Sequence, residues 1–204
     1  MAKTASAKHI SEAGNYGDQR EYYASKYLLE HALPNDPEAC LKALEDFDVR
    51  WTMLHLGREK GVYLDRAVVD AIRCRSCNWT GNGHQRPIRA LEVGAYIGYS
   101  AIRIGRILAE CAPEGSHLLS VEQNGDNAWY AARHVKHAGL AGTVAVRHGR
   151  IEECFGHHDN KDDDDNINDN INDSDHSDSS SSSSSELGVA PFDLVFLDHR
   201  KPFY

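Results

Sequence analysis

The stretch Ala90-Leu-Glu-Val-Gly-Ala-Tyr-Ile-Gly-Tyr-Ser100 decides the fold of this 204-residue chain. A short apolar run over residues 88–93 ends in a glycine, and a helical pattern of apolar residues begins at Ser100. Gly94 and Gly98 allow the backbone to turn tightly and to approach a ligand closely. A strand that leads through such a turn into a helix is typical of open parallel sheets, which bind ligands at the carboxyl ends of their strands.

The same alternation of apolar runs and helical patterns continues along the chain. Helical patterns occupy residues 100–111 and about 127–137, and further apolar runs occupy residues 117–121, 143–146 and 192–197. Before the first strand, helices are predicted over residues 21–33, from a cap at Asp36 with Pro37 at the first helical position to about residue 51, and from about Gly61 onward. Strands that alternate with helices predict an α/β, Rossmann-like fold with a parallel sheet and right-handed crossovers.

The charge of the chain divides it into three parts. The segment 156–186 contains nine Asp and one Glu against one Lys, so it carries the whole net charge of −9. Because this segment offers almost nothing to bury, we expect a disordered acidic and Ser-rich insertion there. Residues 1–16 are predicted to be a flexible N-terminus, and residues 17–155 with 187–204 form the predicted catalytic domain.

Composition excludes several classes of partner. No apolar run is long enough to span a membrane, and the first residues do not form a secretory signal. The remainder of the chain has balanced charge, so no basic patch points to nucleic acid. Five scattered cysteines without a signal peptide fit reduced thiols. We expect a cytoplasmic monomer that acts on a small molecule.

Two acids beside the glycine turn indicate the kind of cofactor. Glu92 stands in the strand before Gly94, and a carboxylate there disfavours phosphate but suits a cation with an amino group, as in S-adenosylmethionine (SAM). Glu122 ends the second apolar run, where an acid can accept hydrogen bonds from both ribose hydroxyls. The alternative is a generic strand, turn and helix with two surface acids.

Several segments resemble the catechol O-methyltransferase family in order and spacing. They are Gly17-Asp18, Leu29-Glu-His31 with Pro34, Gly57-Arg-Glu-Lys-Gly61, Leu91–Ser100, and Val195-Phe-Leu-Asp-His199 with Lys201. The resemblance covers residues 17–155 and 191–204, and the insertion at 156–186 has no counterpart in the family. It implies the SAM-dependent methyltransferase fold, of which this chain would hold the helices and strands one to four of a seven-stranded sheet.

The resemblance also implies residue roles. Glu92, Tyr96 and Ser100 would hold the methionine part of SAM, Gly94 would provide the close turn, Leu56 would add a backbone contact, Glu122 would bind the ribose, and His199 would lie near the adenine. Asp198 would be a Mg²⁺ ligand, and Lys201 would be the general base that accepts the proton of a catechol hydroxyl. The implied reaction is magnesium-dependent methyl transfer from SAM to that hydroxyl, as in catecholamine metabolism.

Other positions depart from the family pattern. Arg200 stands in place of the usual Trp, Gln123 in place of an apolar residue, and Thr52 and Leu54 in place of Trp and Met. Arg150 and Ile151 fall where small polar and amide side chains are usual. These departures leave open a methyltransferase for another ortho-diphenol.

The family's further metal ligands, an Asp-Asn pair, would follow Lys201. We therefore expect the complete protein to be longer and the fourth strand to be an edge in this chain, with an inactive SAM-binding fragment as the alternative.

Overall fold

A computed structural model describes residues 17–77, 86–151, 153 and 191–198. Three helices come first: α1 (Arg20–His31), α2 (Pro37–Arg50) and α3 (Gly57–Cys77). Strands and helices then alternate through β1 (Arg89–Val93), α4 (Tyr99–Cys111), β2 (His117–Glu122), α5 (Gly125–His137), β3 (Val144–His148) and β4 (Leu194–Leu197). The predicted order of elements is confirmed. The predicted insertion, N-terminal segment and chain end at 199–204 lie outside the described residues.

The four strands form one parallel sheet in the order β3-β2-β1-β4. This is the order with which the doubly wound Rossmann sheet begins, so the predicted α/β, Rossmann-like fold is confirmed. In the described part of the chain β4 is an edge strand, as predicted. Val195 and Leu197 are 51% and 62% exposed there.

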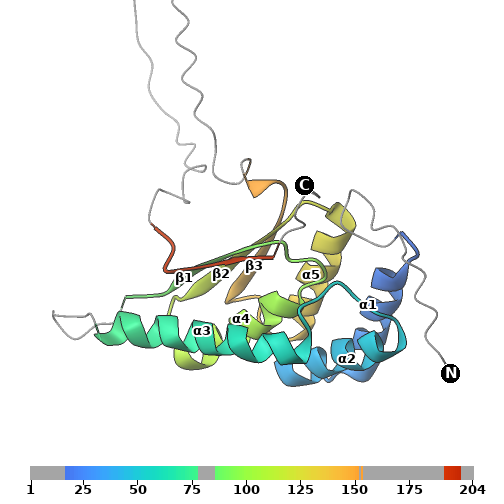
Figure 1. Ribbon diagram of the computed structural model, residues 1–204, viewed down its shortest axis with the longest axis horizontal. Helices are drawn as coiled ribbons and strands as arrows, with labels where there is room; N and C mark the ends of the chain where they lie inside the picture. The colour runs from blue at the N-terminus through green and yellow to red at the C-terminus, as the bar shows by residue number, and fades with distance from the viewer. Residues whose placement is uncertain (1–16, 78–85, 152, 154–190, 199–204) are drawn as a thin grey trace, which may run out of the picture.

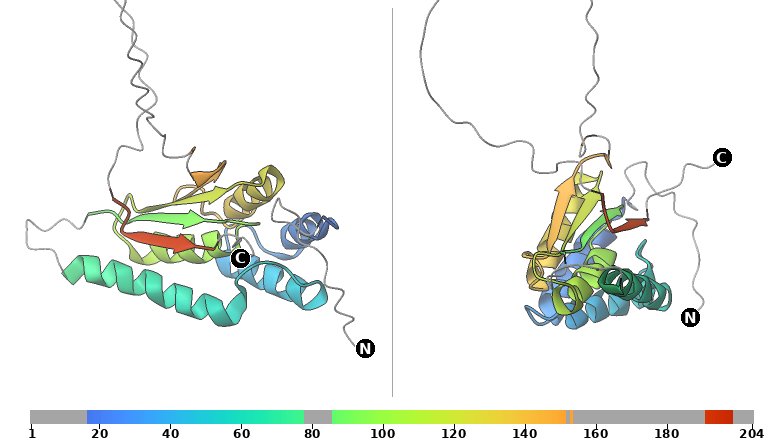
Figure 2. Two further views of the ribbon diagram at one scale, coloured as in Figure 1. Left: turned by 45° about the horizontal axis from the view of Figure 1, so that its top comes forward. Right: turned by 90° about the vertical axis from the view of Figure 1, so that its left-hand side faces the viewer.

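The described helices lie together on one side of the sheet, as the two views of Figure 2 show, and Figure 1 shows α3, α4 and α5 along it. The main core lies between these helices and the sheet, and its fully buried residues include Leu28, Leu44, Ile102 and Leu118. A smaller cluster of Leu91, Leu119 and Val121 covers the opposite face. Helix α4 is thus packed between the sheet and helices α2 and α3.

Local chemistry explains where the helices begin. Asp36 caps α2 as predicted, because its carboxylate accepts a hydrogen bond from the Ala39 amide at 2.9 Å. The start of α3 differs from the prediction, since the helix begins at Gly57 and not near Gly61. Gly61 lies against the guanidinium of Arg103, which leaves no room for a Cβ atom. Close packing, rather than a helix boundary, therefore accounts for Gly61.

Candidate active site

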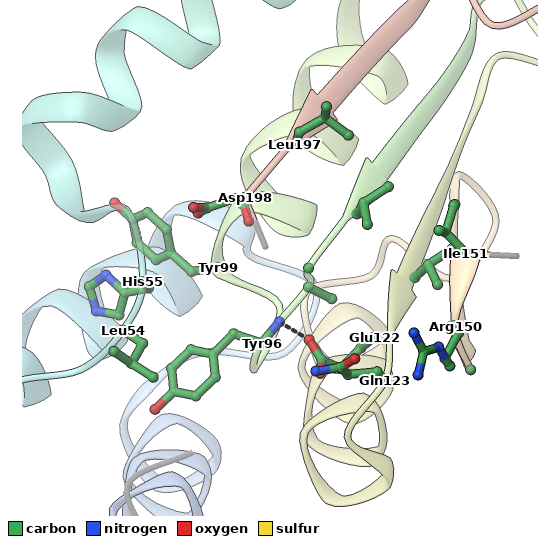
Figure 3. Close-up of a pocket in the computed structure, with 16 residues that line it drawn as sticks. Leu54, His55, Tyr96, Tyr99, Glu122, Gln123, Arg150, Ile151, Leu197 and Asp198 are labelled. Carbon is green, nitrogen blue, oxygen red and sulfur yellow. Dashed lines mark hydrogen bonds between the residues drawn. The ribbon is translucent and has the colours of Figure 1, made fainter. Parts of the chain in front are cut away.

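A pocket of about 530 Å³ opens at the carboxyl ends of the strands. It lies where strand order reverses around β1, which is where open α/β sheets bind their ligands. Four segments line it: the loop between α2 and α3, the glycine turn after β1, the end of β2 and the residues after β3, with the end of β4 at the edge (Figure 3). Its volume suits a ligand of cofactor size.

The glycine turn has a backbone that most side chains would not tolerate. Gly94 and Gly98 have φ angles of 99° and 91°, and Tyr96 between them has a φ of 48°. The Gly94 amide donates to the Val121 carbonyl at 2.8 Å, and the Gly98 amide donates to the Ala95 carbonyl at 2.8 Å. The turn is therefore tied to β2, and its predicted site residues Gly94, Tyr96 and Ser100 line the pocket.

Glu92 is fully buried beneath this turn. Its Oε2 accepts a hydrogen bond from the Ser120 hydroxyl at 2.5 Å, while Oε1 has no partner among the described residues. The pKa of Glu92 is raised to about 7, mainly by burial and also by the charges of Asp198 and Glu122, while hydrogen bonds from Ser100 and Ser120 act in the opposite direction. Glu92 itself does not line the pocket but lies directly before the lining residues Val93 and Gly94.

Glu122 ends β2 and faces the pocket. Its Oε2 accepts from the Tyr96 amide at 2.8 Å, which Figure 3 shows as a dashed line, and its Oε1 accepts from the Asn124 amide at 2.8 Å. Burial raises the pKa of Glu122 above its usual value, while these backbone donors favour the ionised form. A carboxylate can accept more hydrogen bonds than these, such as one from a ribose hydroxyl.

The opposite wall contains two residues to which the sequence analysis gave no role. His55 lines the pocket and stacks on Tyr99, with ring centroids 4.4 Å apart. The Tyr99 hydroxyl donates to Glu45 at 2.7 Å and accepts from Arg103 at 2.8 Å. Tyr99 lay within the glycine stretch, so its position could have been inferred, but His55 belongs to a loop whose place depends on helix packing.

Tyr96 also connects the pocket to the first helix. Its hydroxyl donates a hydrogen bond to Glu21 at 2.8 Å, and both side chains are buried. In Figure 3 the Tyr96 ring points from the turn toward the wall formed by Leu54 and His55. The ring therefore lies between the wall of Leu54 and His55, whose apolar part is Leu54, and the polar end formed by Glu122.

The remaining predicted site residues lie at the rim or outside the described residues. Asp198 follows β4, is exposed and lines the pocket, whereas Leu56 stands next to the lining residues of its loop. His199 and Lys201 are not described. Within the residues that the structure describes, no three His, Cys, Asp or Glu side chains are grouped to hold a metal ion.

The departures from the family pattern cluster at the polar end of the pocket. Gln123, Arg150 and Ile151 all line it beside Glu122 (Figure 3). Leu54 lines the apolar wall, while Thr52 does not reach the pocket. The chemistry around a bound nucleoside would therefore differ from the family pattern mainly in this half.

Together, these features define a Rossmann-like α/β domain with a cofactor pocket. Glu122 lines this pocket at the end of β2, and Glu92, whose Oε1 has no hydrogen-bond partner among the described residues, lies buried beneath the glycine turn. Phosphate is disfavoured because the acids lie next to the glycine turn.

Comparison with known proteins assigns this domain to a family, although no family model matches the chain. A probable O-methyltransferase of Mycobacterium tuberculosis is 32% identical over 203 residues, which cover 98% of this chain and 69% of that protein. Catechol O-methyltransferase of Bos taurus is 30% identical over 190 residues, which cover 92% of this chain and 54% of that protein. The chain belongs to the O-methyltransferase family that includes the catechol O-methyltransferases. It spans about half the length of the catechol O-methyltransferases it matches.

Solved structures give a more distant likeness. The O-methyltransferase TomG from Streptomyces achromogenes, solved in complex with SAM, aligns over 95% of this chain and 57% of its own, with a TM-score of 0.47 and 20% identity. At this distance the likeness assigns no residue of the site. Separately, none of the helices in the described ranges combines the length and apolar character needed to cross a membrane.

Proposed function

We propose that the protein is a SAM-dependent O-methyltransferase that methylates a catechol hydroxyl. The buried Glu92 beneath a glycine turn at the strand ends, whose Oε1 has no hydrogen-bond partner among the described residues, carries this proposal. Family membership supports it, because relatives that match most of the chain are named as O-methyltransferases.

Each residue has a distinct part in the proposed reaction. Glu92 accepts hydrogen bonds from the ammonium group of SAM, and Glu122 accepts them from the ribose hydroxyls. Tyr96 and the wall with Leu54 hold the sulfonium end away from water. The hydroxyl oxygen of the substrate attacks the methyl carbon as the sulfur–carbon bond breaks, and Lys201 takes the hydroxyl proton. Holding both reactants in contact supplies much of the acceleration.

The proposal also names catechol as the substrate and Mg²⁺ as the metal ion. Asp198 offers one carboxylate at the pocket edge, and a hard cation such as Mg²⁺ prefers oxygen ligands. When bound, such an ion would lower the pKa of a chelated catechol hydroxyl. Both parts rest on the resemblance of the segment 195–201 to the family.

Incubation of the protein with methyl-labelled SAM and catechol, with and without a chelator, tests the reaction. We expect labelled methyl-catechol that disappears with chelator and returns with added Mg²⁺. Lys201→Met should lower kcat by about a hundredfold or more, while the exposed Lys136→Met on α5 serves as the matched control. Activity indifferent to the chelator would contradict the magnesium part. Equal rates for the two lysine variants would contradict the assigned base.

A SAM-binding protein without turnover is the second candidate. The pocket at the strand ends, with Glu122 at one end, would suffice for SAM binding alone. Calorimetry that detects SAM binding in a preparation unable to methylate catechol or other ortho-diphenols would support this alternative. Turnover of a different ortho-diphenol would instead change only the assigned substrate.

A further inference from the structure

The loop of residues 51–56 between α2 and α3 depends on a contact from another helix. This loop provides Leu54 and His55 to the pocket wall, but it has no regular secondary structure of its own. Inside the loop, the Met53 amide donates to Asp48 at 2.6 Å. The first two residues of the loop, Trp51 and Thr52, contact helix α1.

Arg20 in the first turn of α1 makes that contact. Its Nη1 donates to the carbonyl oxygen of Thr52, and its guanidinium lies over the Trp51 ring at 5.4 Å from the centroid. Its Nε and Nη2 donate to the two carboxylate oxygens of Asp18, at 2.9 Å and 2.7 Å. Arg20 is only 5% exposed, so this cation is buried among defined partners.

The planar guanidinium of Arg20 makes hydrogen bonds in two directions. One edge pairs with the Asp18 carboxylate, and Nη1 reaches a backbone carbonyl 32 residues further along the chain. The ammonium of a lysine is a compact point charge and cannot reproduce both sides of this arrangement. The opposite end of the loop is fixed separately, because His55 stacks on Tyr99.

We propose that Arg20, oriented by Asp18, is a positioning residue that holds the loop of residues 51–56 as a wall of the cofactor pocket. Arg20 does not line the pocket, so it acts through the loop and not on the ligand. The proposal rests on the proposed function for its effect on SAM, whereas its effect on the loop stands on the contacts alone.

Kinetics and proteolysis of the intact protein test this role together. In Arg20→Gln we expect KM for SAM to rise about tenfold, because a buried charged hydrogen-bond donor is lost, with kcat within about threefold. Trypsin cleaves after Arg50 and Arg58, which flank the loop. In Arg20→Gln we expect cleavage at both sites to be faster than in wild type. Saturating SAM should suppress this cleavage. Arg66→Gln is the matched control, since Arg66 is exposed on α3.

Two conservative variants keep the proposal testable if Arg20→Gln does not fold. Arg20→Lys and Asp18→Asn should give intermediate KM values and intermediate cleavage rates, even if Arg20→Gln does not fold. Cleavage after Arg50 and Arg58 at control rates in the folded variants, with unchanged KM, would overturn the proposal. If wild-type protein shows no methyl transfer, the proposed function fails, and the proteolysis comparison still decides the role of Arg20.

Discussion

Replacing Glu92 with glutamine should change the pH dependence of stability in a defined way. The folded-state pKa of Glu92 is raised by burial from 4.5 to about 7, so the native protein holds this proton more tightly than the unfolded chain does. Stability therefore falls as pH rises through this window. Because one pKa unit corresponds to about 1.4 kcal/mol, the loss amounts to about 3 kcal/mol, most of it between pH 5 and pH 8.

Glu92→Gln resembles the protonated acid and lacks this titration. Urea unfolding of both proteins at several pH values gives the free energy of unfolding of each. We expect the variant to gain about 3 kcal/mol relative to wild type between low and high pH. Taking this difference between pH values removes any constant packing cost of the substitution. A difference that stays flat from pH 5 to pH 8 would refute the assignment of a raised pKa.

Two further substitutions test the surroundings of the glycine turn. Gly98→Ala should lower the free energy of unfolding by about 1–2 kcal/mol, because φ is 91° and a Cβ atom would lie 3.0 Å from the Ala131 Cα atom. Thermal unfolding checks this, with Gly142→Ala, whose Cβ would meet nothing within 4 Å, as the control. Burial lowers the pKa of His134 to about 4, so wild-type stability falls as pH drops from 6.5 toward 4. His134→Gln should flatten that acid limb in urea titrations, and an unchanged limb would exclude His134 as its source.

The sequence predicted most of the fold because its signals are local. The Asp36 cap, the glycine turn and the apolar strands each act within a few residues, and each is present as expected. Glu122 was predicted at the pocket because parallel strands end at one edge of the sheet. Topology of this kind follows from the order of elements alone.

The remaining contacts of the site depend on long-range packing and could not be predicted from local sequence patterns. His55 reaches the pocket because α2, α3 and α4 fix the loop and bring Tyr99 against its ring. The contact from Arg20 to the Thr52 carbonyl joins segments that no helical or strand period connects. The third helix was predicted to begin near Gly61, yet it begins at Gly57, and Gly61 packs inside it against the Arg103 guanidinium. Contacts of this kind depend on the packing of whole helices.

Two fully buried titratable groups at the glycine turn, Glu92 and His134, have opposite effects on stability. Glu92 lies before the turn and His134 binds the Ile97 carbonyl within it at 2.7 Å, and both are fully buried. Between about pH 4.5 and 6.5 the acid lowers stability with rising pH while the histidine raises it, so their effects largely cancel. Above pH 7 the cost of the ionised Glu92 remains, and a bound cation would offset it. Glu92→Gln should therefore be more stable and bind SAM more weakly at that pH, which is the trade-off expected where a site sacrifices stability for binding.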